Sequence, residues 1–308
     1  MTNFDETERQ FRALHDSAVK EYEEQLQRAK AARDERNKRK QADEAELRKS
    51  LKGSGIDFGL LDKRDQRDAD ALDAHLKRVR PGLVSRASGA AADFKQRSLQ
   101  ASLLSEVCQI KVPLYTASII APDTRYLDGI EGERSGAWIF PSNPGQVELF
   151  DNDKGSGTGW GAEAGSAMPP TATFWFSFTP SQTARWELTA ILAFHGFYIA
   201  RADDGIFTHK EAKVRLHVKL DIFQYFWNGA KLFKLIDIDE SDIDVVEFYD
   251  RTEFLFDTVT LRAGDPVWVK VDVSVRALAD GGGSYAEINF RDGAANFIEP
   301  LFLSIVTV

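Results

Sequence analysis

The sequence predicts a mainly β protein, in which an antiparallel β-sandwich of the jelly-roll or Greek-key type follows an N-terminal α-helical region. Two stretches with near-strict alternation carry this prediction. Residues 212–226 place apolar side chains at Val214, Leu216, Val218, Leu220 and Ile222. Residues 266–277 place them at Val267, Val269, Val271, Val273 and Val275. Since successive side chains of a strand point to opposite faces, each stretch has a dry face that a second sheet must cover.

Composition divides the 308 residues into two regions. Residues 1–100 hold 22 Lys and Arg against 19 Asp and Glu, whereas the remainder is acidic and brings the net charge to −9. All six tryptophans follow residue 100. We therefore expect a helical region over residues 1–104 and a β-sandwich domain over residues 105–308.

A long helix is expected from about residue 5 to residue 51, because this stretch contains neither proline nor glycine. Its apolar stripe recurs at helical spacing and includes Phe11, Leu14, Tyr22 and Leu26. A run of charged residues follows at 33–40, and two glycines at 53 and 55 end the helix. The stripe must pack against the sandwich or against copies of itself, as in a coiled coil. We hypothesise that it mediates self-association.

Two shorter helices are expected before the β region. The first spans residues 65–79 and stops at Arg80-Pro81-Gly82. The second spans residues 90–107 and carries Phe94, Leu99 and Leu103.

From residue 110 onward, short β-branched and aromatic runs alternate with turn residues, which is typical of an all-β domain. The expected strands are 110–121, 136–140, 146–150, 171–179, 184–201, 212–226, 230–237, 245–249, 253–262, 266–277, 284–291 and 297–308. Asn228-Gly229 predicts a type I′ hairpin turn, because both residues tolerate positive φ. Residues 151–170 contain five glycines and predict a long loop.

Common catalytic motifs are missing from the sequence, so we expect a protein that is not an enzyme. It contains no His-Glu-x-x-His, Cys-x-x-Cys, Walker loop or Gly-x-Ser-x-Gly pattern, and its five histidines lack metal-ligand spacing. One enzymatic alternative stays open. A glycosidase uses two carboxylates whose separation is set in space, and sequence spacing does not exclude such a pair.

Asp237, Asp239 and Asp242 form the candidate metal site, because Ca²⁺ binds carboxylate and carbonyl oxygens in loops. The alternative is that these acids keep sheet edges apart and the protein in solution. No other cofactor is expected.

Trp160, Trp227 and Trp268 are the candidate binding residues, since each is expected outside the core. An exposed tryptophan can stack on a sugar ring or anchor a protein interface. The alternative is that a neighbouring loop or the N-terminal helices cover each ring.

The N-terminus lacks a signal peptide, and no apolar run is long enough to span a membrane. With its single cysteine, the chain is expected in the cytoplasm, or released by a non-classical route. The basic cluster Arg36, Lys38, Arg39 and Lys40 is interleaved with acids, which favours a solvated helix face over a nucleic-acid partner.

The leading functional hypothesis from the sequence is a structural or adhesion-type protein that assembles into a homo-oligomer or docks to a larger assembly through its N-terminal helix. The alternative is a carbohydrate-binding, lectin-like module, with calcium assisting the glycan contact.

Overall fold

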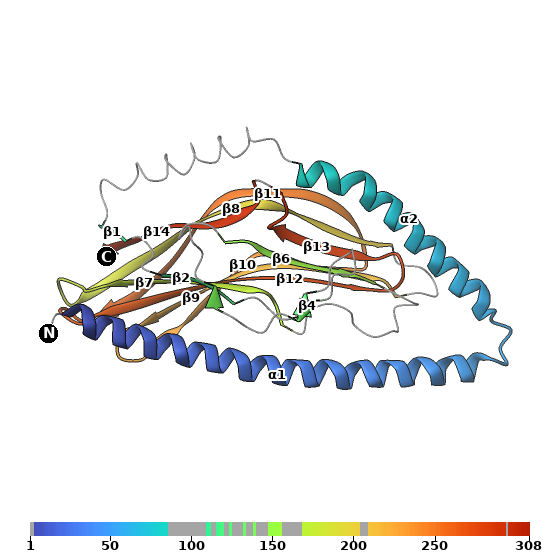
Figure 1. Cartoon of the computed structure of the whole chain (residues 1–308), viewed down its shortest axis with the longest axis horizontal. Coiled ribbons are helices and arrows are strands. Elements are labelled where there is room, and N and C mark those ends of the chain that lie inside the picture. Colours follow the sequence, from blue (N-terminus) through green and yellow to red (C-terminus); the bar gives the residue numbers. More distant parts are fainter. Residues whose placement is uncertain are drawn as a thin grey trace.

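The structure is a computed structural model (Figure 1). It describes residues 3–85, 147–155, 168–203, 209–293 and 295–308, together with the short strands at 109–111, 115–119, 123–124, 132–133 and 138–139. Two six-stranded sheets pack face to face, and every strand pair described is antiparallel. The predicted β-sandwich with N-terminal helices is therefore confirmed.

Sheet A is organised around β8, which pairs with β11 along one side and with β13 and β14 along the other. Its strands are β1 (Gln109–Lys111), β6 (Leu149–Lys154), β8 (Ala184–Asp203), β11 (Asp242–Leu261), β13 (Tyr285–Phe290) and β14 (Phe297–Thr307). Strand β11 merges two stretches expected as separate strands, because Asp250–Thr252 continue the ladder to β8 without interruption.

Sheet B has the strand order β10-β9-β12-β7-β2-β5. Its members are β2 (Tyr115–Ile119), β5 (Trp138–Ile139), β7 (Thr171–Phe178), β9 (Glu211–Phe223), β10 (Trp227–Glu240) and β12 (Val267–Asp280). A separate two-stranded sheet joins β3 (Asp123–Thr124) to β4 (Gly132–Glu133).

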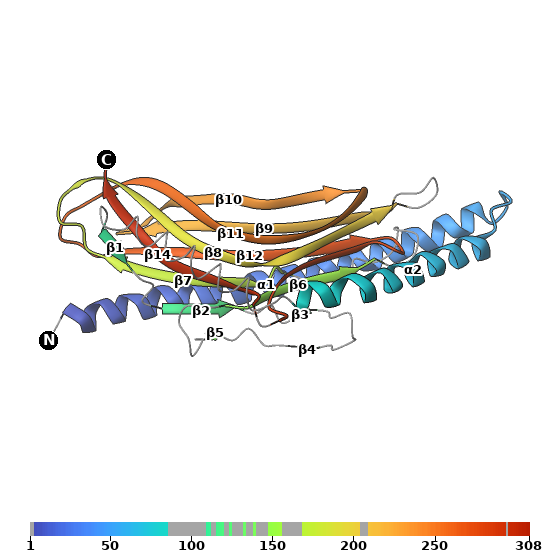
Figure 2. The same cartoon turned by 90° about the horizontal axis from the view of Figure 1, so that it is seen from above.

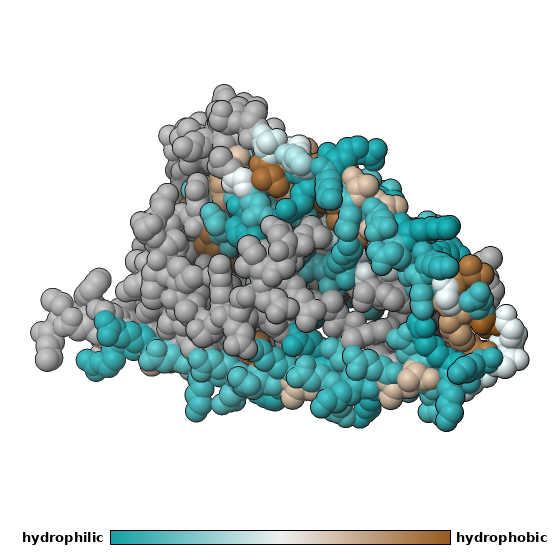
Figure 3. Space-filling model, turned by 45° about the vertical axis from the view of Figure 1, so that its right-hand side comes forward, coloured by the Kyte–Doolittle hydropathy of each residue, from teal (hydrophilic) through white to brown (hydrophobic). Residues whose placement is uncertain are grey.

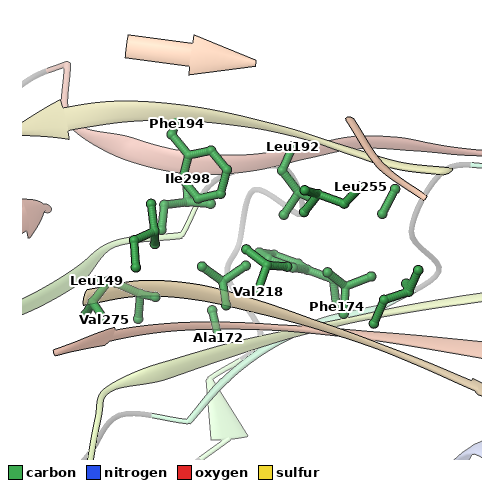
Figure 4. Packing of buried hydrophobic residues seen from close by; sticks show 14 of the residues in the cluster. Leu149, Ala172, Phe174, Leu192, Phe194, Val218, Leu255, Val275 and Ile298 are labelled. Atoms are coloured by element: carbon green, nitrogen blue, oxygen red, sulfur yellow. The ribbon is translucent and has the colours of Figure 1, made fainter. Parts of the chain in front are cut away.

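The two strands whose alternation predicted the fold lie next to each other in sheet B. Val218 of β9 pairs with Val273 of β12, and both side chains are fully buried. Across the sandwich, β8 supplies Leu192 and Phe194, so the two inner faces close one continuous core (Figure 4).

The two helices lie on opposite outer faces of the sandwich (Figures 1 and 2). Helix α1 (Asn3–Leu51) runs beneath sheet B, and α2 (Phe58–Val84) crosses sheet A. The turn between them ends at Asp57, whose side chain caps α2 by accepting hydrogen bonds from the N–H groups of Gly59 and Leu60. Neither described helix contains an apolar segment of the length that a membrane crossing requires.

Helix α2 is fixed to sheet A by an apolar stripe and by ion pairs. Leu72, Leu76 and Leu83 pack with Phe197, Ile199 and Tyr285 on the outward side of the sheet. At the end of the helix, Arg80 Nε donates to both oxygens of Glu287, at 3.2 and 3.3 Å, and Nη2 donates to Asp292 at 2.8 Å.

The predicted end of this helix at Arg80-Pro81-Gly82 was wrong. The helix continues through Pro81 to Val84, and the N–H of Ser85 donates to the Pro81 carbonyl at 2.9 Å. Leu83 is 6% exposed, so contact with sheet A stabilises a turn that proline only weakens.

The prediction of a loop throughout residues 151–170 was also wrong at its start. Strand β6 extends to Lys154, with Asp151 and Asp153 buried. Their carboxylates accept the backbone N–H groups of Ala277 at 2.8 Å and Ala279 at 2.9 Å. At Ala277 and Ala279, strand β12 extends beyond its ladder with β7, which ends at Ser274. The two carboxylates therefore bind the backbone N–H groups that a neighbouring strand would otherwise bind. The expected helix at 90–107 and the glycines at 157, 159, 161 and 165 lie outside the described residues.

Replacing Val218 by Asp is expected to destabilise the protein by several kcal/mol, because an unpaired carboxylate would face the dry core. That loss is comparable with the total stability of about 5–15 kcal/mol typical of a folded domain. Denaturant unfolding measures it. The neighbouring Lys219→Ser is the control, since this side chain is 43% exposed. Equal losses from both substitutions would contradict the assignment of faces.

Replacing Arg80 by Ala is expected to cost about 3–5 kcal/mol of unfolding free energy, because it leaves the fully buried Glu287 without its cation. The matched control is Arg78→Ala on the exposed side of the same helix, with an expected change of about 0.5 kcal/mol or less. Adding Glu287→Gln to Arg80→Ala should recover part of the loss. A double variant no more stable than Arg80→Ala would show that the buried charge is not the cause.

Candidate functional site

The candidate site lies at the end of the sandwich where β9 turns into β10. The alternation of β9 ends at Phe223, which pairs with Trp227, so the turn consists of Gln224, Tyr225 and Phe226. The predicted turn at Asn228-Gly229 was wrong. Gly229, with φ of 95°, lies in a register shift between Trp227 and Ala230, where an extra residue forms a β-bulge.

Gln224 fastens this turn to the loop between β11 and β12. Its Nε2 donates to the Arg262 carbonyl at 2.8 Å, and its Oε1 accepts the Arg262 N–H at 2.9 Å. The second loop is in turn tied to the loop between β7 and β8. There the Ala263 N–H donates to Thr183 Oγ1, and the Gly264 N–H donates to the Pro180 carbonyl, both at 3.0 Å. Three loops are thus held in one arrangement.

Three consecutive aromatic side chains stand exposed on the fastened turn and at the first residue of β10: Tyr225 at 55%, Phe226 at 66% and Trp227 at 42%. We call them the aromatic platform. The Tyr225 hydroxyl donates to the Asp265 carboxylate, and this hydrogen bond raises the pKa of Tyr225. The Asp265 carboxylate also forms an ion pair with Arg262, whose Nε lies 3.7 Å away. Polar groups therefore border the apolar rings.

Trp227 is supported from behind by the partly buried ring of Phe223 and the fully buried ring of Trp175. Its centroid lies 5.2 Å from that of Phe223 and 6.3 Å from that of Trp175, and the Lys270 ammonium lies 5.5 Å from the ring centre. Trp175 is fully buried, and Leu14 of α1 packs beside it. The N-terminal helix thus contributes to the base of the aromatic platform.

The structure places the three tryptophans that were predicted to bind a ligand in different environments. Trp227 is exposed at the candidate site, as predicted. The prediction for Trp268 was wrong, since the ring is 1% exposed and packs with Trp175, Phe223 and Leu14. It does point away from the core, but α1 covers it. Trp160 lies outside the described residues.

Tyr225 and Phe226 were missed, because residues 212–226 were expected to form one continuous strand. One feature of the sequence could have predicted that some of these rings are exposed. Tyr225-Phe226-Trp227 is an aromatic triplet, and three successive large rings cannot all lie on the dry face of a strand whose side chains alternate.

Two of the three acidic residues proposed as metal ligands form ion pairs with basic side chains. Asp237 and Asp239 of β10 lie opposite Arg215 and Lys213 of β9, with ion pairs of 3.1 Å in each case. The hydrogen bond from Lys234 lowers the pKa of Asp237. Asp242 belongs to β11, in the other sheet.

Among the described residues, the structure forms no cluster of three or more Asp, Glu, His or Cys side chains that could hold a metal ion. The structure does not bring the three candidate calcium ligands together: Asp237 and Asp239 belong to a ladder of cross-strand ion pairs, and Asp242 lies in the other sheet. Sequence spacing could not separate a calcium site from such a ladder, because the cations come from a different strand.

The apolar stripe of α1 is partly used within the chain. Leu14 packs against Trp175 and Trp268, and Leu26 is 5% exposed. The side chains of Phe11 and Tyr22 lie outside the described residues. Self-association through the stripe stays a prediction, although part of the apolar surface that motivated it has a partner in its own sandwich.

The turn between the helices carries a separate apolar surface, visible at the right-hand end of the molecule in Figure 3. Leu47, Ile56 and Leu60 are 40%, 37% and 63% exposed there. They surround a cavity of about 380 Å³ that is also lined by Leu51 and Phe58.

Comparison with known proteins identifies no family for this chain. No family model matches it, and no curated protein matches its sequence. Solved structures with partial similarity include TmCBM61 in complex with β-1,4-galactotriose, at 8% identity and a TM-score of 0.20 over 55% of this chain and 97% of that one. A family 35 carbohydrate-binding module from an environmental isolate has 10% identity and a TM-score of 0.18 over 53% and 91%.

A third structure is a Paenibacillus sp. cycloisomaltooligosaccharide glucanotransferase with cycloisomaltoheptaose, at 13% identity and a TM-score of 0.18. The match covers 54% of this chain and 17% of the enzyme. TM-scores this low establish neither a shared family nor a shared function. The β-sandwich rests on the strand pairing of the chain itself.

Proposed function

We propose that this chain is a non-enzymatic carbohydrate-binding module and that the aromatic platform is its binding surface. The observation that carries the proposal is the exposure of three consecutive aromatic rings, at 42–66%, at a turn fixed by the two hydrogen bonds between Gln224 and Arg262. Large exposed apolar side chains that gather on a soluble surface mark interaction sites.

Carbohydrates match the chemistry of this surface. One face of a pyranose ring presents C–H groups that stack on an aromatic ring, while the hydroxyls at its rim require hydrogen-bonding partners. Phe226 and Trp227 supply the rings, and Asp265 with Arg262 supplies polar groups beside Tyr225. The fixed turn lowers the entropy cost of binding, because its backbone is ordered before the ligand arrives.

We propose that this surface binds a glycan without hydrolysing it. A glycosidase needs two carboxyl groups on either side of the scissile bond. The three fastened loops, residues 179–183, 224–226 and 262–266, contain one carboxylate, Asp265, which bonds to Tyr225 and Arg262. Assembly through the N-terminal helix, the leading hypothesis from the sequence, remains a prediction.

A glycan array followed by calorimetric titration of the retained oligosaccharides tests the proposal. We expect Trp227→Ala and Phe226→Ala each to weaken binding about tenfold or more, which corresponds to about 1.4 kcal/mol. Leu232→Ala is the matched control, because Leu232 is 54% exposed on β10 away from the aromatic platform. Each variant should keep the wild-type circular dichroism spectrum.

Three results would oppose the proposal. Retention of no glycan by the wild-type protein would exclude carbohydrate binding under the conditions of the array. Glycan binding that survives both aromatic substitutions would place the site elsewhere. Release of shorter oligosaccharides from a bound glycan would contradict the non-enzymatic part.

A further inference from the structure

We propose that the free edge of β11 is a strand-addition site for an extended segment of a partner protein in which basic and apolar residues alternate. This site is separate from the aromatic platform, and it does not depend on the proposed function. The inference rests on the backbone of β11, on its side chains and on a comparison with β10.

The backbone of β11 offers a long edge. Over its 20 residues, from Asp242 to Leu261, the strand pairs with β8 in unbroken register, and within the described part of the chain it pairs with no other strand. Lys231 Nζ donates to the Phe256 carbonyl at 2.7 Å from β10 in the other sheet. This carbonyl therefore points away from β8, and an added strand would displace Lys231 from it and from the Phe256 ring, whose centre lies 4.5 Å from the ammonium.

The direction of the peptide groups alternates along a strand together with the side chains. Residues Thr252 and Phe254 have the same parity as Phe256, so their N–H and C=O groups also point to the free edge. The same residues direct their side chains to the outward face of sheet A. A strand added here would contact both the backbone and the exposed rings.

The two faces of β11 select different residue types in a partner. On the outward face, Phe254 and Phe256 are 47% and 50% exposed and would pack against apolar side chains. On the opposite face, Glu253 and Asp257 carry negative charge at the same edge. The Tyr249 hydroxyl donates a hydrogen bond to the Glu253 carboxylate at 2.9 Å and so fixes its position. Beside residues 253–257, an added strand would therefore meet exposed rings on the outward face and carboxylates on the opposite face.

The charge of β11 argues against a second copy of this chain as the occupant. The strand contains six carboxylates and one arginine, and pairing two such edges would bring like charges into direct opposition. A basic segment removes this repulsion and adds favourable cross-strand pairs. Charge complementarity thus identifies the partner as a different, basic polypeptide.

The edge of β10 shows how the same chain protects a strand that should not pair. Strands β10 and β11 run along the same side of the sandwich (Figures 1 and 2). In β10 the ladder shifts register twice, between Trp227 and Ala230 and between Lys234 and Ile236, and lysines stand at Lys231 and Lys234. Bulges and lysines are devices that blunt an edge. Strand β11 has no lysine, no proline and no register shift.

Fluorescence anisotropy with a labelled ten-residue peptide of alternating lysine and valine tests the proposal. We expect the full-length protein to bind this peptide, with an affinity that falls as salt is added. Three control peptides should bind at least tenfold more weakly. They are the alternating glutamate–valine peptide, a peptide with five lysines followed by five valines, and the alternating peptide with N-methylated backbone amides.

Two variants locate the binding. Thr252→Pro removes an N–H that points to the free edge and leaves the ladder to β8 intact, so peptide affinity should fall at least tenfold. Phe254→Ser tests the same strand through its side chain and should also weaken binding, in case the proline variant fails to fold. Leu232→Ser on β10 is the control and should not change the affinity.

Four outcomes would overturn the proposal. The first is equal binding of the alternating and N-methylated peptides, and the second is binding that survives both Thr252→Pro and Phe254→Ser. The third is the absence of binding at millimolar peptide. The fourth is a doubling of the molar mass of the protein that is abolished by Thr252→Pro, which would identify a second copy as the occupant.

Discussion

Both sheets of this sandwich carry large apolar side chains on their outward faces, and the position of the N-terminal helices follows from this constraint. Trp175 and Trp268 point away from the core of sheet B, and Phe197 and Ile199 point away from that of sheet A. Burying a side chain of this size contributes about 1.5–3 kcal/mol. The helices supply that burial, with Leu14 of α1 on one face and the leucines of α2 on the other. They are therefore outer layers of the fold.

The surfaces that the helices leave open are the ones to which we assign interactions. The aromatic platform stands at one end of the sandwich, and Trp227 rests on Trp175, which α1 helps to cover. The edge of β11 lies along one side, opposite the ladder to β8. The first surface suits a small ligand with apolar faces and hydroxyl groups, and the second suits an extended polypeptide. Both rely on backbone that is already ordered, which lowers the entropy cost of binding.

Local patterns in the sequence predicted most of the fold but only part of the site. Alternation located β9 and β12, and the absence of proline and glycine located α1, because both signals depend on neighbours in the chain. Whether an outward-facing ring is covered depends on a distant segment. For that reason Trp268 was assigned to the surface, whereas Leu14 lies against it. Asp151 is a further case, since its partner is a backbone N–H 126 residues away. The turn at Tyr225 was missed because Asn228-Gly229 is the stronger local turn signal.

Native-state hydrogen exchange measures most directly whether the helices and the sandwich form one unit. If α1 and α2 are outer layers of the fold, amides near Leu26 and Leu72 should exchange only through global unfolding. Their opening free energies would then equal those of β9 and β12, and Arg80→Ala would lower all of them by the same amount. The contradicting result is exchange of the helical amides several orders of magnitude faster than that of the strands. It would show that the helices separate from a sandwich that stays folded without them.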